Sequence, residues 1–525
     1  MDETRNGKVR VVAQVPLIDG LQTPYHQFRD QFMRPNLPVL ISGLMNHWRA
    51  FREWSSPFGV PDFDYLATRF GNSNVQVAEC STREFTDQKR VNMTVADYIT
   101  YWKRHNSYKQ DLDCAGSFLY LKDWHFVKDY PEYGPYSTPI FFMDDWLNLY
   151  LEHYQLHANE GEVETPGCLS DYRFVYMGPK GTWTPLHADV LRSYSWSSNI
   201  CGKKLWHLLP PSETHLIFDR HMRSSVYNIY GDISVEEFPN FHKAGWLECT
   251  QEKGQILFVP SKWYHQVTNL EDTISINHNW INGYNLHWVW ELILTDYKET
   301  RASIEDIRLI ADDFEELCQR NLAENSGMNF KDLFLFLRRM MVFFLSYLHH
   351  NRSTIKEEKH EQEIFSTSIE KTSVSREVST QVLFNLKSIR LVAQLLASVD
   401  TCEQCMLASP DEGEVESANW IPWVDNARNS EYGTFLSNLI GPCTSPDISG
   451  SCLCAPDMSE VSHRASLIDM ECSKKGKSET SRGLLLQGTT QSISVVAAKV
   501  KTPTALILVI QAIIDQFRQA YQIGF

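Results

Sequence analysis

The sequence predicts an α+β protein in which a β barrel or sandwich is preceded by mixed helices and strands and followed by helices. Between residues 171 and 290, short runs of branched and aromatic residues recur between Gly, Pro, Asn and Asp, which is typical of strands in an all-β domain. After Asn285 the apolar residues recur at intervals of three and four, which indicates helices. The 525 residues, 43% of them hydrophobic, are enough to bury a large core.

Residues 1–130 predict a mixed α/β part of the same fold. The run FRDQFMR has the apolar spacing of a helix, and LPVLISG is a short strand-like run that ends at Gly43. Further along, VADYITYWKRH is helical and SFLYLKDW has the branched and aromatic composition of a strand. We expect the β core itself to occupy residues 131–290, with strands in DYRFVYMG, KKLWHLLPP, GQILFVP, WYHQVTNL and TISINHNWING.

The remainder of the chain predicts helices and polar segments. We expect residues 291–350 to form helices that pack on the core or on one another, and residues 381–440 to form a further helical segment. Residues 351–380 are rich in Glu, Lys, Ser and Thr, which favours a solvated linker. Residues 441–525 predict a disordered tail with a terminal amphipathic stretch, ALILVIQAIIDQFRQAYQI. The C-terminal helices are also candidates for a homo-oligomeric contact.

Composition excludes several classes of function. The formal net charge of −16 argues against non-specific nucleic-acid binding, which requires a basic face. The N-terminal residues hold no long apolar stretch, so we expect no secretory signal. The longest apolar run, residues 505–514 broken by Gln511, is shorter than a membrane span, so we expect no membrane segment. The 12 cysteines show no regular framework, which favours the cytoplasm and leaves the nucleus open.

Three residues predict a metal centre. His187 and Asp189 form the only His-x-Asp of the sequence, and His265 follows at the start of another predicted strand. On an extended strand, residues i and i+2 point to the same side, so both His187 and Asp189 can face the interior. Two histidines and one carboxylate can occupy one face of an octahedral Fe(II), which leaves three positions open. A bidentate 2-oxo acid and dioxygen could fill those positions.

A charged ligand inside the barrel would explain two further patterns. Lys203 and Lys204 are neighbours on a predicted strand, so alternation allows only one of them to enter the barrel. A buried ammonium is costly without a partner, and a cosubstrate carboxylate would suit it. The run from Thr273 to Asn279 has one wholly polar face. The alternatives are that both lysines extend to solvent and that the polar face lies at an exposed edge.

Together these motifs resemble the jumonji C (JmjC) family of Fe(II)- and 2-oxoglutarate-dependent oxygenases over residues 10–290. The resemblance rests on LPVLISGLMNHWRAFREW, SFLYLKDW, the T-x-x-H-x-D strand, the G-x-K-x-W strand and the distal His strand. It implies a double-stranded β-helix of cupin (jelly-roll) type and a dioxygenase that uses iron, 2-oxoglutarate and dioxygen. It also implies the following site residues: metal ligands and catalytic residues His187, Asp189 and His265; cosubstrate contacts Lys204, Thr184 and Asn277.

Two positions depart from the family pattern. Ser197 falls where several relatives carry Asn, and Phe141 falls where some relatives use a Tyr to reach the cosubstrate carboxylate. Their roles are therefore left open. Trp206 and Trp263 are expected to pack the barrel rather than to contact substrate.

Within the family, the strings SFLYLKDWHF and TPLHADVLRSYSWSSNICGKKLWHLLPP resemble the small JmjC-only protein hydroxylases. This resemblance implies C-4 hydroxylation of a lysine in the NIKS motif of the eukaryotic translation release factor, which would be the protein partner. Three alternatives remain. The first is Nε-methyl-lysine demethylation, which differs only in which substrate carbon lies at the iron. The second is a cupin that binds a metal for a non-oxidative function, and the third is a non-catalytic JmjC scaffold.

Overall fold

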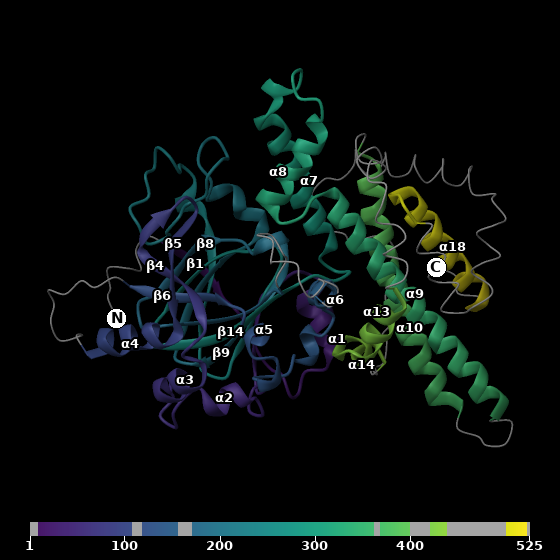
Figure 1. Cartoon of the computed structure of the whole chain (residues 1–525), viewed down its shortest axis with the longest axis horizontal. Coiled ribbons are helices and arrows are strands. Elements are labelled where there is room, and N and C mark those ends of the chain that lie inside the picture. Colours follow the sequence, from purple (N-terminus) through teal and green to yellow (C-terminus); the bar gives the residue numbers. More distant parts are fainter. Residues whose placement is uncertain are drawn as a thin grey trace. The chain divides into compact units, whose positions relative to one another are not determined.

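The computed structural model describes residues 9–107, 118–155, 171–361, 368–399, 420–437 and 500–521 (Figure 1). They fall into two compact units, of which the first lies within Met1–Phe142 and Glu160–Trp280. The second lies within Met143–Asn159 and Ile281–Phe525. Every strand among the described residues lies in the first unit, and the long helices lie in the second.

The smaller sheet of the first unit has five strands and carries most of the predicted site. Its order is β1 (Arg10–Gln14), β11 (Gly245–Gln251), β10 (Lys204–Leu209), β13 (Tyr264–Asn269) and β8 (Trp183–His187). All neighbours are antiparallel except β1 and β11. Strands distant in sequence therefore lie side by side, which brings the β8 and β13 histidines together.

The larger sheet has nine strands and lies opposite the smaller one. Its order is β2 (Leu17–Asp19), β3 (Val39–Ser42), β12 (Ile256–Val259), β9 (Tyr194–Cys201), β14 (Thr273–Trp280), β7 (Arg173–Gly178), β6 (Leu119–Trp124), β4 (Asn74–Glu84) and β5 (Asp87–Thr94). Trp206 and Val267 of the small sheet share one buried cluster with Leu40 and Leu257 of the large sheet. The two sheets thus enclose a common interior, and the predicted α+β jelly roll is confirmed.

Short helices surround these sheets in the first unit. They are α1 (Tyr25–Phe28), a π-helical turn (Arg29–Met33), α2 (Arg49–Glu53), α3 (Phe63–Phe70), α4 (Val95–Ser107) and α5 (Phe126–Asp129). In α4 the buried residues recur at helical spacing, and the hydroxyl of one of them, Tyr98, donates to the carbonyl of Met177 on β7 at 2.7 Å. This bond anchors α4 to the large sheet.

The second unit is helical. It comprises α6 (Trp146–Gln155), α7 (Leu286–Ser303), α8 (Phe314–Ser326), α9 (Phe330–Glu361), α10 (Ser368–Ala397), α13 (Trp420–Asn429), α14 (Glu431–Ser437) and α18 (Pro503–Tyr521). Aromatic pairs join α6 to α9: Trp146 lies 5.2 Å from Phe344 and Tyr150 lies 5.2 Å from Phe336, measured between ring centroids. Among the described residues, no helix combines the length and apolarity that crossing a bilayer requires.

The structure corrects two of the expected boundaries. The described residues of the expected solvated linker, 351–380, are helical, because α9 continues to Glu361 and α10 begins at Ser368. Glu and Lys are strong helix formers, so a polar composition does not by itself end a helix. The predicted 131–290 core is interrupted, because its described residues 143–155 and 281–290 belong to the helical unit. The expected disorder of residues 441–499 falls outside the described residues, whereas the terminal amphipathic stretch lies in α18.

Gly202 is required by the turn that leads from β9 into β10. It has φ +75°, and a Cβ atom placed there would lie 2.2 Å from the carbonyl oxygen of Asp272. We expect Gly202→Ala to lower the free energy of unfolding by about 3 kcal/mol, because left-handed strain and a backbone collision add. The midpoint of urea unfolding, followed by tryptophan fluorescence, measures this loss.

Gly134→Ala is the matched control for that substitution. Gly134 has φ +59° but nothing within 4 Å of its Cβ position, so only the left-handed strain remains. We expect a loss of about 1 kcal/mol. Equal losses for the two variants would show that the collision with Asp272 is not what requires glycine at position 202.

Candidate metal centre

The structure brings His187, Asp189 and His265 together in the first unit. One ligand atom from each residue lies within 4.8 Å of the others, so the three could hold a metal ion. His187 and His265 are direct cross-strand partners on β8 and β13, and their ring centroids are 4.3 Å apart. The antiparallel pairing of these strands therefore creates the site from positions far apart in sequence.

Asp189 lies beyond the last paired residue of β8 but keeps the predicted direction. The strand ends at His187, whereas the backbone of Asp189 remains extended at φ −59° and ψ 150°. Leu186 and Ala188 pack together on the opposite side, in a buried cluster with Tyr264. The alternation of side chains thus continues through Asp189, as the His-x-Asp spacing predicts.

Hydrogen bonds orient each of the three ligands. Nδ1 of His187 lies 2.8 Å from the carbonyl oxygen of Pro185, and Nδ1 of His265 lies 3.0 Å from that of Trp263. If Nδ1–H donates in both cases, Nε2 of each imidazole is free to bind a metal. Asp189 Oδ2 accepts a hydrogen bond from the Ser195 hydroxyl at 2.6 Å. These bonds fix the donor atoms before any ion binds.

The site favours neutral imidazole. Burial and the neighbouring His265 lower the pKa of His187 to about 4, although Asp189 acts in the opposite direction. A histidine must be unprotonated to bind a metal. His187 is thus in its metal-binding form at neutral pH.

Two consecutive residues after Asp189 adopt left-handed backbone conformations. Leu191 has φ +54° and Arg192 has φ +51°, and neither is a glycine. Such conformations cost about 1–3 kcal/mol each and persist where surrounding packing determines them. Leu191 is buried, and Arg192 stacks over the ring of Tyr264 at 5.6 Å. The turn that follows Asp189 is therefore held rigidly.

A β-bulge places Thr184 on the same face as His187. His265 pairs with His187 and Val267 pairs with Thr184, so three steps on β8 match two steps on β13. The extra residue reverses the alternation that would otherwise turn Thr184 away. Val267 belongs to the buried cluster between the sheets. Thr184 therefore faces the interior, on the side where the sequence predicts a cosubstrate contact.

Lys204, and not Lys203, enters the interior. Lys204 is 2% exposed, and its Nζ contacts the Ser275 hydroxyl at 2.6 Å. Asn277 Nδ2 lies 3.2 Å from the same hydroxyl. Lys203 instead points outward to Glu252 and Glu271, at 3.4 and 3.7 Å. The alternation predicted for this lysine pair is thus realised, and Lys204 and Asn277 share one polar cluster.

This cluster fits an anionic cosubstrate. Burial lowers the pKa of Lys204 to about 7, and no carboxylate among the described residues pairs with its ammonium group. The Ser197 hydroxyl, on the residue directly opposite Asn277, is buried without a hydrogen-bond partner. A carboxylate placed here would satisfy both groups. Lys204, Thr184 and Asn277 are therefore suitably placed to hold 2-oxoglutarate.

Phe141, whose role the sequence left open, does not reach the cluster around Lys204. Phe141 stacks on Phe28 at 4.8 Å, and Phe28 packs on Phe258, whose neighbour Leu257 faces the interior. Phe141 therefore lies behind the large sheet and cannot reach Lys204. The residue that sequence reasoning missed is Tyr120.

Tyr120 comes from β6 and is buried beside the polar cluster. Its hydroxyl contacts the side chain of Asn269, which is the cross-strand partner of Lys204. Burial raises the pKa of Tyr120, so the phenol stays protonated. The signal was present in SFLYLKDW, where alternation places Tyr120 and Lys122 on the same side.

Trp206 and Trp263 pack the interior, as expected. Both belong to the buried cluster between the sheets. The Trp206 ring centroid is 5.6 Å from that of His265. These rings give the metal centre an apolar wall on the β10 side.

Comparison with known proteins agrees with this geometry. A family model described as a cupin-like domain matches residues 25–285. Fold and site together define a metal-binding cupin-like protein. The chain belongs to the JmjC family of 2-oxoglutarate and iron-dependent oxygenases.

Three relatives illustrate the match. The 2-oxoglutarate and iron-dependent oxygenase JMJD4 of Gallus gallus is 35% identical over 74% of this chain and 87% of its own length. JMJD4 of Homo sapiens is 39% identical over 60% of this chain and 72% of its own length. A protein of Arabidopsis thaliana named arginine-specific demethylase JMJ20 is 54% identical over 65% and 73%. The predicted resemblance to the JmjC-only oxygenases is therefore confirmed, as is dependence on iron and 2-oxoglutarate.

Proposed function

We propose that this oxygenase hydroxylates C-4 of a lysine in the NIKS motif of the eukaryotic translation release factor, in the cytoplasm. The observation that carries the proposal is the similarity to the JMJD4 oxygenases, which extends over 87% of the Gallus gallus protein. The motif strings around Tyr120 and His187 point to the same group. The partner is then a protein, which must present one side chain to the metal centre.

The residues of the chain have distinct tasks in this reaction. Dioxygen is the oxidant, and bound iron and 2-oxoglutarate would activate it: one oxygen atom ends in succinate as the cosubstrate loses carbon dioxide, and the other is inserted into a C–H bond of the substrate. His187, Asp189 and His265 would hold the metal on one face and leave its other positions open. Lys204 would pair with the distal carboxylate of 2-oxoglutarate. The tryptophans of the interior keep water from the reacting atoms.

A second candidate is removal of an N-methyl group from arginine or lysine. It is favoured by the 54% identity to the protein named arginine-specific demethylase. Oxidation of a methyl carbon gives a hemiaminal that loses formaldehyde, so the same site serves if the substrate presents a methyl group instead of C-4. A non-catalytic scaffold is less well supported, because all three candidate metal ligands are present.

Mass spectrometry of the release factor tests the first candidate. The purified factor is incubated with the full chain, Fe(II), 2-oxoglutarate and air, beside a reaction containing His187→Ala. We expect one added oxygen on the NIKS lysine, in most molecules of the wild-type reaction and none of the control. The readout is the mass of the tryptic peptide and the position of the added oxygen within it.

A methylated histone peptide serves as the parallel substrate. Formaldehyde release with loss of one methyl group, and no oxygen on the release factor, would replace the first candidate with the second. Succinate formation that depends on His187 without either product would leave the oxygenase activity in place and reject both substrates.

A further inference from the structure

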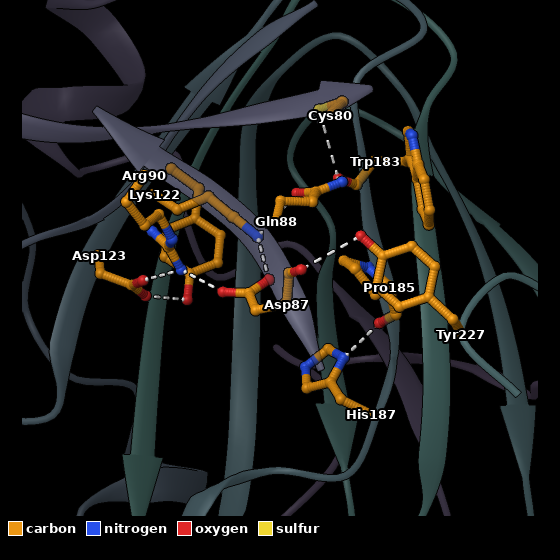
Figure 2. A network of polar contacts seen from close by, with 11 residues as sticks. Cys80, Asp87, Gln88, Arg90, Lys122, Asp123, Trp183, Pro185, His187 and Tyr227 are labelled. Atoms are coloured by element: carbon orange, nitrogen blue, oxygen red, sulfur yellow. Dashed lines mark hydrogen bonds and ion pairs between the residues drawn. The ribbon is translucent and has the colours of Figure 1, made fainter. Parts of the chain in front are cut away.

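A partly buried ionic network joins β5 and β6 near the strand that carries His187 (Figure 2). Arg90 Nη2 lies 2.9 Å from Asp87 Oδ2 and 2.8 Å from Asp123 Oδ2. Lys122 Nζ lies 3.4 Å from Asp87 Oδ1 and 3.1 Å from the side-chain oxygen of Gln88. Two cations thus contact Asp87, and Arg90 is shared with a second carboxylate.

Hydrogen bonds connect this network to the strand that carries His187. Gln88 Nε2 donates to the carbonyl oxygen of Trp183 on β8 at 3.1 Å. The Tyr227 hydroxyl lies 3.4 Å from the backbone oxygen of Asp87, while the amide of Leu186 donates to the Tyr227 carbonyl at 3.0 Å. Figure 2 shows Asp87, Gln88, Trp183 and Tyr227 together with His187. These bonds tie the start of β5, which carries Asp87, to β8, which carries His187.

The network is built at a cost to the backbone. Lys122 and Asp123 are adjacent on β6 and would normally face opposite sides. The pairing of β6 with β7 is irregular between Leu121 and Trp124, and Asp123 has φ +57°. This bulge lets Asp123 reach Arg90 as well as the Tyr176 hydroxyl, which donates to Oδ1 at 2.6 Å. Such strain persists where a site requires it.

Asp87 combines a fixed negative charge with access to solvent. Burial alone would raise the pKa of Asp87, but the charge of Lys122, the Gln88 amide and Arg90 together lower it to about 2. Its side chain is nevertheless 46% exposed, unlike that of Lys122 at 3%. A carboxylate offers about four acceptor positions, and the two cations occupy only part of them. One face of Asp87 is left for a further donor.

We propose that Asp87 accepts the cationic group of the substrate side chain and so selects lysine or arginine for the metal centre. The inference rests on the proposed function, and it deepens it by naming the group that recognises the substrate. Arg90 and Lys122 are positioning residues, because they hold the carboxylate and keep it ionised. The cation is the feature that both candidate substrates share. A charge-assisted hydrogen bond to Asp87 would favour a cationic side chain over a neutral one of similar shape.

Calorimetric titration of the full chain tests this role. The probes are a NIKS-motif peptide with its lysine and the same peptide with norleucine, which has a similar shape but no ammonium. We expect the lysine peptide to bind wild type at least about 10-fold more tightly than the norleucine peptide. In Asp87→Asn the two affinities should agree within about twofold. Asp87→Glu should recover most of the preference, because it restores the charge.

Asp64→Asn is the matched control, because Asp64 is 91% exposed and pairs only with Lys103 among the described residues. It should leave the preference unchanged. Equal binding of the two peptides to wild type, or a preference that survives in Asp87→Asn, overturns the proposal. If the lysine peptide does not bind at all, the release-factor substrate is wrong. A methylarginine peptide and its citrulline analogue then decide the role of Asp87 by the same comparison.

Discussion

His187→Ala is expected to abolish substrate oxidation and to lower iron affinity by at least about 100-fold. The substitution removes one of three donor atoms that lie within 4.8 Å of one another, and two donors cannot define one face of the metal. The fold should persist, because the imidazole makes its hydrogen bond to the carbonyl of Pro185 in its own strand. Iron content after dialysis and succinate formation measure the two losses.

His125→Ala is the matched control for that loss. His125 also pairs with a carboxylate, that of Asp171 at 3.0 Å, but it belongs to neither the metal centre nor the Lys204 cluster. Its iron content and turnover should equal those of the wild type. If His187→Ala keeps its iron and its turnover, His187 is not a metal ligand. Circular dichroism would establish that both variants are folded.

Lys204→Met is expected to stabilise the protein while disabling it. Burial lowers the pKa of Lys204 to about 7, against roughly 10.4 in an unfolded chain. Between these values the unfolded chain binds more protons, so wild-type stability rises with pH from about 7 to about 10. Methionine has no such dependence. At pH 7 the variant should be more stable by roughly 3 kcal/mol, after allowance for the hydrogen bond that Ser275 loses with Lys204.

The functional effect of the same substitution has the opposite sign. Without the ammonium, the KM for 2-oxoglutarate should rise about 10- to 100-fold or turnover should disappear. Urea unfolding without cosubstrate, measured at pH 7 and at pH 10, follows the stability difference, which should shrink toward pH 10. Lys203→Met is the control, because Lys203 faces Glu252 and Glu271 at the surface. A variant that is less stable at pH 7, or that retains the wild-type KM, contradicts this assignment of Lys204.

The periodicity of single strands was enough to predict which side of a strand several site residues face. The side shared by His187 and Asp189, and the opposite sides of Lys203 and Lys204, follow from the alternation of an extended chain. Alternation alone would not place Thr184 on the side of His187, because only the bulge in β8 turns it toward that residue. A bulge adds one residue against a partner strand, and the partner is not visible in the sequence.

Residues whose roles depend on contacts between distant strands could not be predicted from the alternation of side chains along one strand. Phe141 falls where some relatives use a Tyr, and its role was left open; it stacks behind the large sheet, and Tyr120 occupies the interior instead. Asp87 lies at the start of a hairpin strand that has no site motif of its own. Its importance arises from Arg90 and Lys122, which the pairing of β4 with both β5 and β6 brings together. Sheet order, rather than spacing, determines these contacts.

The placement of α6 has a consequence for biosynthesis. This helix is translated between β6 and β7, but Trp146 and Tyr150 pack on Phe344 and Phe336 of α9, which leaves the ribosome much later. Its apolar face must therefore wait, uncovered, while the remaining barrel strands are made. A nascent chain that stalls before α9 would expose this face and offer it to chaperones. Shortened proteins that end after the barrel should share this liability and aggregate even though every metal ligand is present.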